Sequence, residues 1–181
     1  MAVWRRRPFF AGPRDALRDW LCEPASLTAR LKRRGMFRLV LLSQLRRPAN
    51  ADECAALGFA PRAPCWVREV VLHCDGEPLI FAHTALPTEP RGIVGRWFAR
   101  LGTRSLGSLL FAHPGFARGD LAFARLDARH PLHARAVAAL GRPEAAAGTF
   151  RARRCVHRFS GQRVLVTEVF SPALAAMAGD A

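Results

Sequence analysis

Two charged side chains stand in the middle of otherwise apolar runs, and both are of types that handle small polar ligands. Arg68 lies in "CWVREVVLHC" and Glu168 lies in "RVLVTEVF". An arginine presents a planar fork of donors that matches a carboxylate, and a glutamate can accept a proton or a hydrogen bond. An unpaired charge in an apolar interior is prohibitively costly, so each residue requires a partner, either in the protein or in a ligand.

Alternation along a strand places residues i and i+2 on the same face. Arg68 then shares a face with Trp66, Val70 and Leu72, and Glu168 shares one with Val164, Val166 and Phe170. In one interpretation, Arg68 and Glu168 pair with each other or with Glu69 and brace the core. In the other, this face lines a dry pocket where Arg68 holds a substrate carboxylate and Glu168 faces a polar or reacting part of the ligand.

The strands that must carry these two residues are predicted by turn signals. Asp75-Gly76 between two apolar runs is the strongest short signal for a hairpin, and Ser160-Gly161 suggests a second hairpin near the C-terminus. The expected strands cover 36–44, 65–74, 77–86, part of 116–126, the run before Ser160, and 163–170.

Helices are expected in the intervening segments. The sequence predicts helices over 15–22, capped by Asp15, and over 26–35, with Ser26 as cap and Gly35 as stop. It also predicts glycine-broken helical pieces over 88–111, a helix plus loop over 127–149, and a loop over 46–64. Together these elements predict an α+β fold, with one antiparallel sheet of about six strands and helices packed on it. We expect a single domain over residues 1–181.

The chain is strongly basic, with a formal net charge of +14. Of its 28 basic residues only Lys32 is a lysine, and the arginines are spread along the whole chain. A nucleic-acid footprint should instead cluster on one face, so we expect no nucleic-acid partner. The positive charge would equally draw in a small anionic substrate.

The cysteines and the hydropathy pattern indicate the compartment. Five cysteines without a CxxC pair favour reduced thiols in a cytoplasmic protein. No apolar run approaches the ~18 residues that span a bilayer, so we expect a soluble protein without stable membrane insertion.

His130-x-x-His133 lacks further ligands nearby, and no metal site is expected there.

Three blocks of sequence resemble the chorismate pyruvate-lyase family. They are "WVREVVLHCDGEPLIFAHTALP", "LGTRSLGSLLF" and "RRCVHRFSGQRVLVTEVFSP", in this order, within a resemblance that covers roughly 15–172. The resemblance implies a carbon–oxygen lyase that eliminates pyruvate from the dianion chorismate to give 4-hydroxybenzoate for ubiquinone biosynthesis. It also implies an antiparallel sheet, helical flaps over a buried ligand pocket, a monomer and no cofactor.

The resemblance also carries site residues. Arg68 matches the arginine that binds a ligand carboxylate, Leu106 a position whose backbone touches the ligand, and Glu168 the glutamate near the ring oxygen. Glu168 is thus the candidate catalytic residue, either as base for the ring proton or as hydrogen-bond partner. Leu27 falls where the family has a methionine that contacts the ligand. The segment 127–149 is longer than in the compact family form.

Two other functions remain open at this stage. The same fold resembles the effector-sensing domains of some bacterial transcription regulators, which bind small ligands without turning them over. Such regulators carry a helix-turn-helix domain, for which the residues before the first hairpin leave little room. The other alternative is a basic nucleic-acid binder, whose affinity should fall steeply with salt.

Glu69, on the face opposite Arg68, is expected to be a structural partner. The histidines are expected to be ordinary core or surface residues.

Overall fold

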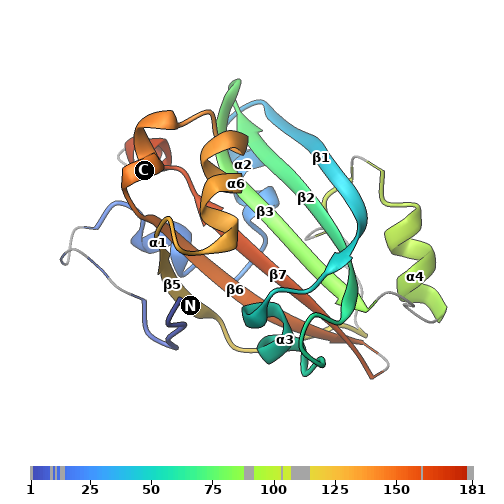
Figure 1. Ribbon diagram of the computed structural model, residues 1–181. Helices are drawn as coiled ribbons and strands as arrows, with labels where there is room; N and C mark the ends of the chain where they lie inside the picture. The colour runs from blue at the N-terminus through green and yellow to red at the C-terminus, as the bar shows by residue number, and fades with distance from the viewer. Residues whose placement is uncertain are drawn as a thin grey trace.

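The protein is an α+β structure built on one antiparallel sheet, as the sequence predicts (Figure 1). The computed structural model describes all residues except 1, 9, 11, 13–14, 88–91, 103, 107–114, 160 and 179–181. Its strands run in the order β1-β2-β3-β7-β6-β4, and β5 pairs with β6. Their bounds are β1 Phe37–Pro48, β2 Pro64–Cys74, β3 Glu77–Pro87, β4 Ala117–Arg118, β5 Ala122–Leu126, β6 Phe150–Phe159 and β7 Gln162–Phe170. The seventh strand arises because 116–126 forms two short strands instead of one.

Both predicted hairpins are present, and their pairing builds the centre of the sheet. Asp75 and Gly76 both adopt positive φ, at 51° and 84°, as a type I′ turn between β2 and β3 requires. Gly161, at φ 76°, lies in the turn between β6 and β7. The two hairpins join through antiparallel pairing of β3 with β7. The strands that carry Arg68 and Glu168 therefore belong to one sheet.

One face of the sheet is covered by the N-terminal helices, α1 (Arg18–Leu21) and α2 (Leu27–Arg34). Trp20 and Leu31 are fully buried in a cluster with side chains from β2, β3 and β7. The cap of α2 is as predicted, because the Ser26 hydroxyl accepts from the amide of Ala29. The helix expected over 15–22 is shorter than predicted, and Asp15 accepts from the amide of Leu17 without being the N-cap itself.

The prediction of a loop over 46–64 was wrong. β1 continues to Pro48, and α3 spans Ala51–Leu57. Asn50 and Glu53 form a reciprocal capping box at its start, and Gly58 ends it in the left-handed conformation at φ 71°. The Asn-x-x-Glu spacing is a helix-start signal close to the known capping-box pattern, and the surrounding proline and alanine content concealed it.

The opposite face carries α3 and α6 (Pro131–Ala139), which lie in front of the sheet in Figure 1, whereas α2 lies behind it. α6 packs its Leu132 and Ala136 against Val71 and Phe81. With the short 3-10 helix Pro143–Ala147, it confirms the helix-plus-loop expected over 127–149. A further 3-10 helix spans Pro172–Ala178. No helix in the described ranges has the length and apolar character needed to cross a membrane.

Of the helical pieces predicted over 88–111, the structure describes α4 (Gly92–Ala99), which stands beside the β1 edge of the sheet (Figure 1). Its buried Val94 and Phe98 pack with Leu86 and Val164. The predicted pieces at 88–91, 103 and 107–111 lie outside the described residues.

Candidate active site

A cavity lies on the face of the sheet that Arg68 and Glu168 share. Its floor comes from β1, β2, β3 and β7, and its cover from the start of α2 and from residues 105 and 106. The residues around it are Ser26, Leu27, Thr28, Leu39, Arg68, Val70, Leu72, Ala82, Thr84, Ser105, Leu106, Val166 and Glu168. All four residues singled out from the sequence (Leu27, Arg68, Leu106 and Glu168) therefore line one cavity. Their roles toward a ligand remain predictions.

The strand register fixes how far apart the two charged residues stand. Arg68 pairs with Thr84 across β2 and β3, and Glu168 pairs with Ala82 across β7 and β3. The two residues are thus two strands apart and offset by two positions along the strands. With spacings of about 4.8 Å between strands and about 3.4 Å per residue, their Cα atoms lie about 12 Å apart.

Arg68 is buried, with 2% of its surface exposed, yet its partners are neutral. Its Nη1 donates to Oε1 of Gln44 at 3.0 Å, and its Nη2 donates to the carbonyl oxygen of Arg104 at 3.1 Å. In the described ranges no ion pair joins Arg68 to an acidic side chain. Burial lowers the pKa of Arg68 from its ordinary value, as expected for a desolvated cation. The bracing interpretation is therefore wrong for Arg68, which has no acidic partner among the described residues.

Glu168 differs from Arg68 because it has a charged partner. Its Oε2 accepts from Nε of Arg153 at 2.6 Å, and the two residues are directly opposite each other across β7 and β6. Sequence reasoning missed Arg153. Nothing in "FRARRCVHRF" distinguishes it from the other arginines of that strand, and only the register with Glu168 identifies it.

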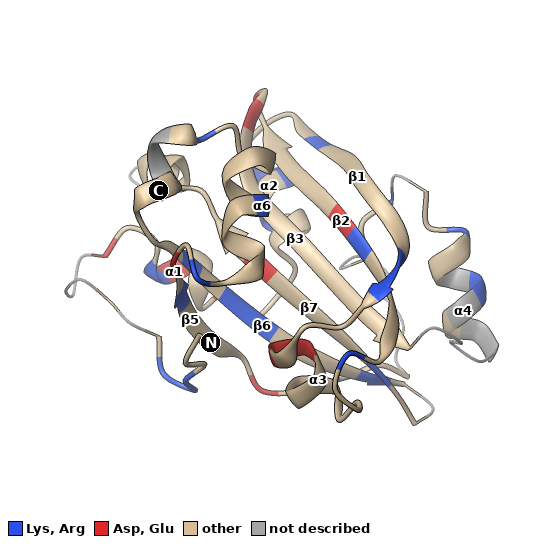
Figure 2. Cartoon of the chain, in the orientation of Figure 1, with Lys and Arg blue, Asp and Glu red and all other residues tan. Residues whose placement is uncertain are grey.

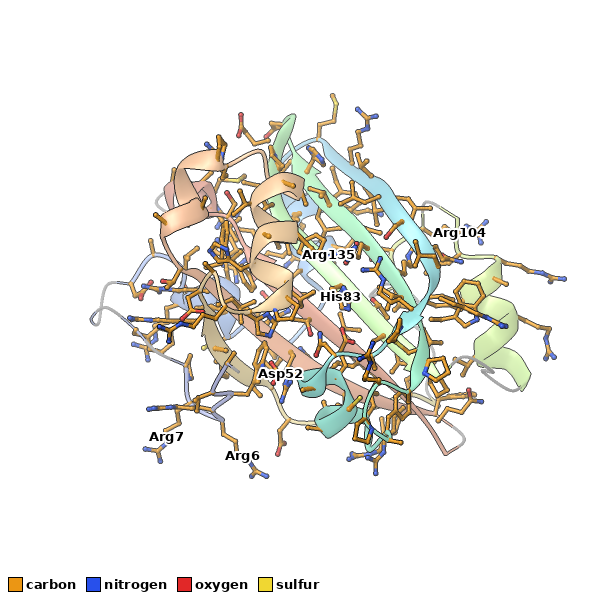
Figure 3. All side chains as sticks on the ribbon, in the orientation of Figure 1. Arg6, Arg7, Asp52, His83, Arg104 and Arg135 are labelled. Carbon is orange, nitrogen blue, oxygen red and sulfur yellow. The ribbon has the colours of Figure 1, made fainter. Side chains whose placement is uncertain are left out.

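Glu69 belongs to a separate polar cluster on the opposite face. It contacts His83 Nδ1 at 2.8 Å, the Ser43 hydroxyl at 3.1 Å, and Arg135. The other ring nitrogen of His83 contacts Glu53 at 2.6 Å. Figure 3 shows His83 and Arg135 on the side of the sheet that α3 and α6 cover, whereas Arg104 lies beside α4. Glu69 is thus a structural partner, as expected, and His83 is part of a buried ionic network.

Polar contacts join the two parts of the cavity cover to each other and attach Phe98 and Arg104 to the sheet. Besides the bond from Arg68 to Arg104, the hydroxyls of Thr28 and Ser105 lie 2.7 Å apart. Gln44 Nε2 also donates to the carbonyl oxygen of Phe98 at 3.4 Å. Gln44 therefore contacts both the cavity arginine and the last turn of α4, a link that no sequence signal indicates.

The two histidines of the His-x-x-His pair have protein partners. His130 Nε2 contacts Asp52 at 2.8 Å, and His133 Nε2 contacts the carbonyl oxygen of Gly148 at 3.0 Å. No group of three or more potential metal ligands gathers in the part of the chain that the structure describes. The basic residues occur on several elements: Figure 2 shows them on the N-terminal segment, β1, α4 and β6, with the longest run on β6.

Solved structures show where the same fold occurs. The effector domain of PhnF from Mycobacterium smegmatis matches with a TM-score of 0.54 and 19% sequence identity, covering 82% of this chain and 90% of that one. The possible transcriptional regulator YydK from Bacillus subtilis matches with a TM-score of 0.56 and 11% identity, covering 76% of this chain and 58% of that one. At such identities the likeness concerns the fold alone.

Sequence relatives are much more similar. A probable chorismate pyruvate-lyase from Dechloromonas aromatica is 57% identical over 174 residues, 94% of this chain and 95% of the relative. One from Ralstonia nicotianae is 48% identical over 160 residues, 86% of this chain and 81% of the relative. The family model described as chorismate lyase matches residues 1–177. This chain therefore belongs to the chorismate lyase family.

Proposed function

We propose that this protein is a chorismate pyruvate-lyase, which converts chorismate to 4-hydroxybenzoate and pyruvate. The observation that carries the proposal is Arg68, a buried guanidinium with only neutral partners among the described residues, on the wall of a cavity that also holds a carboxylate. Such a cation favours an anionic ligand. Family membership supplies the reaction.

The reaction breaks the ether bond between the ring and the enolpyruvyl group. The neighbouring ring carbon, which bears the hydroxyl group, loses its proton, and the ring becomes aromatic. The departing enolpyruvate takes up a proton to become pyruvate, so the atoms of chorismate are all recovered in the two products. The protein must orient the substrate, place charges and exclude water.

In this proposal Arg68 binds the ring carboxylate and Glu168 faces the opposite end of the ring. The separation of about 12 Å between their Cα atoms suits this pose. Glu168 has two candidate roles, as acceptor of the ring proton or of a hydrogen bond from the ring hydroxyl. Leu27 and the backbone of Leu106 would contact the ring from the cover. The net charge of +14 would raise the local concentration of the dianionic substrate.

Four further expectations belong to this proposal. We infer that the chain acts as a single domain and as a monomer, in the pathway that leads to ubiquinone. We place it in the cytoplasm, which suits its five free cysteine thiols. Sedimentation measures the oligomeric state, and cell fractionation measures the compartment.

The test is to mix the purified protein with chorismate and follow pyruvate with lactate dehydrogenase and NADH, together with the absorbance of 4-hydroxybenzoate. We expect the two products in equal amounts. Glu168→Gln separates the two roles of Glu168, because the amide still accepts a hydrogen bond but cannot take a proton. A wild-type protein that releases no pyruvate at micromolar concentration would exclude the lyase function.

The likeness to regulator effector domains favours one second candidate, a sensor that binds a small anion without converting it. The same experiment distinguishes it, since a sensor would bind chorismate or 4-hydroxybenzoate in calorimetry but yield no pyruvate.

A further inference from the structure

Arg153 is buried on the cavity side of β6, with 1% of its surface exposed. It is the cross-strand neighbour of Glu168, and its Nε donates to the glutamate at 2.6 Å. In the part of the chain that the structure describes, no other side chain donates a hydrogen bond to Glu168. Directly opposed residues of opposite charge on one face stabilise each other's position, so the direction of the Glu168 carboxylate depends on Arg153.

The other end of the Arg153 guanidinium is attached to the segment that leads into the cavity cover. Nη1 donates to the carbonyl oxygens of Glu23, Leu21 and Trp20 at 2.8, 3.1 and 3.4 Å. These carbonyls lie at the end of α1 and just after it, where helical partners are missing. Three residues later the chain reaches Ser26, the first cavity residue of the cover. One side chain thus connects Glu168 to the segment before α2.

We propose that Arg153 is a positioning residue for the lyase reaction, which holds the Glu168 carboxylate toward the substrate ring and fixes it relative to the α2 wall. This inference rests on the proposed function. Arg153 does not line the cavity, so it acts through Glu168. A lysine cannot reproduce the role in full, because a single ammonium group lacks the planar fork that spans the carboxylate and the three carbonyls.

The test is a double-mutant cycle with Arg153→Met, Glu168→Ala and the double variant, measured as kcat and KM for chorismate. We expect Arg153→Met to lower kcat by about 10- to 100-fold, because misplacement of a catalytic group has effects of this size, with KM changed less than about threefold. In the Glu168→Ala background the same substitution should change kcat by less than about threefold, because the group it positions is already lost. Arg153→Lys should recover part of the lost kcat.

Arg151→Met is the matched control. Arg151 lies two residues before Arg153 on the same strand and also pairs with a carboxylate, that of Asp15, but it does not line the cavity. We expect it to change kcat and KM less than about twofold, whatever it does to the thermal midpoint. If Arg153→Met does not fold, Arg153→Lys provides the same cycle.

Two results would overturn the inference while wild-type activity stands. One is an effect of the Arg153 substitution that multiplies with that of Glu168→Ala, and the other is a change in KM or stability without a change in kcat. A wild-type protein that releases no pyruvate would instead refute the proposed function, and the two failures are therefore distinct.

Discussion

Replacing Arg68 with methionine should separate ligand binding from stability. Methionine keeps most of the side-chain length and removes the charge. Gln44 Oε1 and the Arg104 carbonyl lose their donor, and each unsatisfied acceptor costs about 1–3 kcal/mol. Removal of a buried cation without an acidic partner among the described residues offsets this loss, because desolvation of such an ion costs several kcal/mol. We therefore expect the free energy of unfolding to change by less than about 2 kcal/mol.

Ligand binding should change far more. A carboxylate held by the Arg68 fork in a water-poor cavity forms a charge-assisted, two-pronged contact. Truncation of one partner of such a pair costs about 3–5 kcal/mol. The dissociation constant of 4-hydroxybenzoate should therefore rise by roughly two to three and a half orders of magnitude.

The assays are calorimetric titration with 4-hydroxybenzoate and urea unfolding of the same preparations. The methyl ester of the ligand, which lacks the negative charge, is the control. It should bind wild type and Arg68→Met with affinities within about tenfold of each other, because the charged contact is absent in both cases. The reasoning fails if Arg68→Met unfolds under native conditions while its folded fraction binds 4-hydroxybenzoate with wild-type affinity.

Three further substitutions test other parts of the structure. Gln44→Glu places a carboxylate beside Arg68. It should weaken 4-hydroxybenzoate binding by about 10- to 100-fold, because the new carboxylate competes with the ligand for the guanidinium. Equal affinities of the variant and wild type in calorimetry would refute this. Burial alone lowers the pKa of His83, but hydrogen bonds to two buried glutamates outweigh it and raise the pKa above its ordinary value. The stability from its protonation is thus complete below about pH 6.5 and is lost as pH rises through the folded-state pKa. The difference in urea midpoint between wild type and His83→Gln should therefore shrink from about pH 6 to about pH 9; a constant difference would contradict it. Asn50→Ala should lower the free energy of unfolding by about 1 kcal/mol and leave kcat unchanged. A loss of kcat would instead show that α3 affects the site.

The elements that carry the site were predictable because their signals are local. Asp75-Gly76 specifies a tight turn from its own backbone preferences. Alternation then assigns Arg68 and Glu168 to faces from a few neighbouring residues, and the cavity lining confirms that these faces coincide. Family likeness added Leu27 and Leu106, which periodicity alone would have left among ordinary apolar residues.

The partners of the charged residues were not predictable for a physical reason. Arg153 meets Glu168, and Gln44 meets Arg68, through cross-strand registers that depend on bulges and on the whole set of sheet contacts. β1 and β2 in particular change register between Leu41 and Ser43. A sequence pattern gives the face of a strand but not which of several arginines on the next strand stands opposite a given glutamate.

The different partners of the two cavity charges support the proposal of an anionic ligand. Arg68 is surrounded by neutral acceptors, whereas Glu168 is already neutralised by Arg153. Arg68, Arg153 and Glu168 together carry two positive charges and one negative charge, so one positive charge is in excess among them. A ligand carboxylate at Arg68 would compensate it, and the same residue would repel a cationic ligand of equal shape. One regulator effector domain and one possible transcriptional regulator share the fold at 19% identity or less, and such a likeness concerns the fold and not the ligand. Under the proposed function, the preference for an anion would follow from Arg68, Glu168 and Arg153. Arg68→Met should therefore change which ligands bind while the free energy of unfolding changes little.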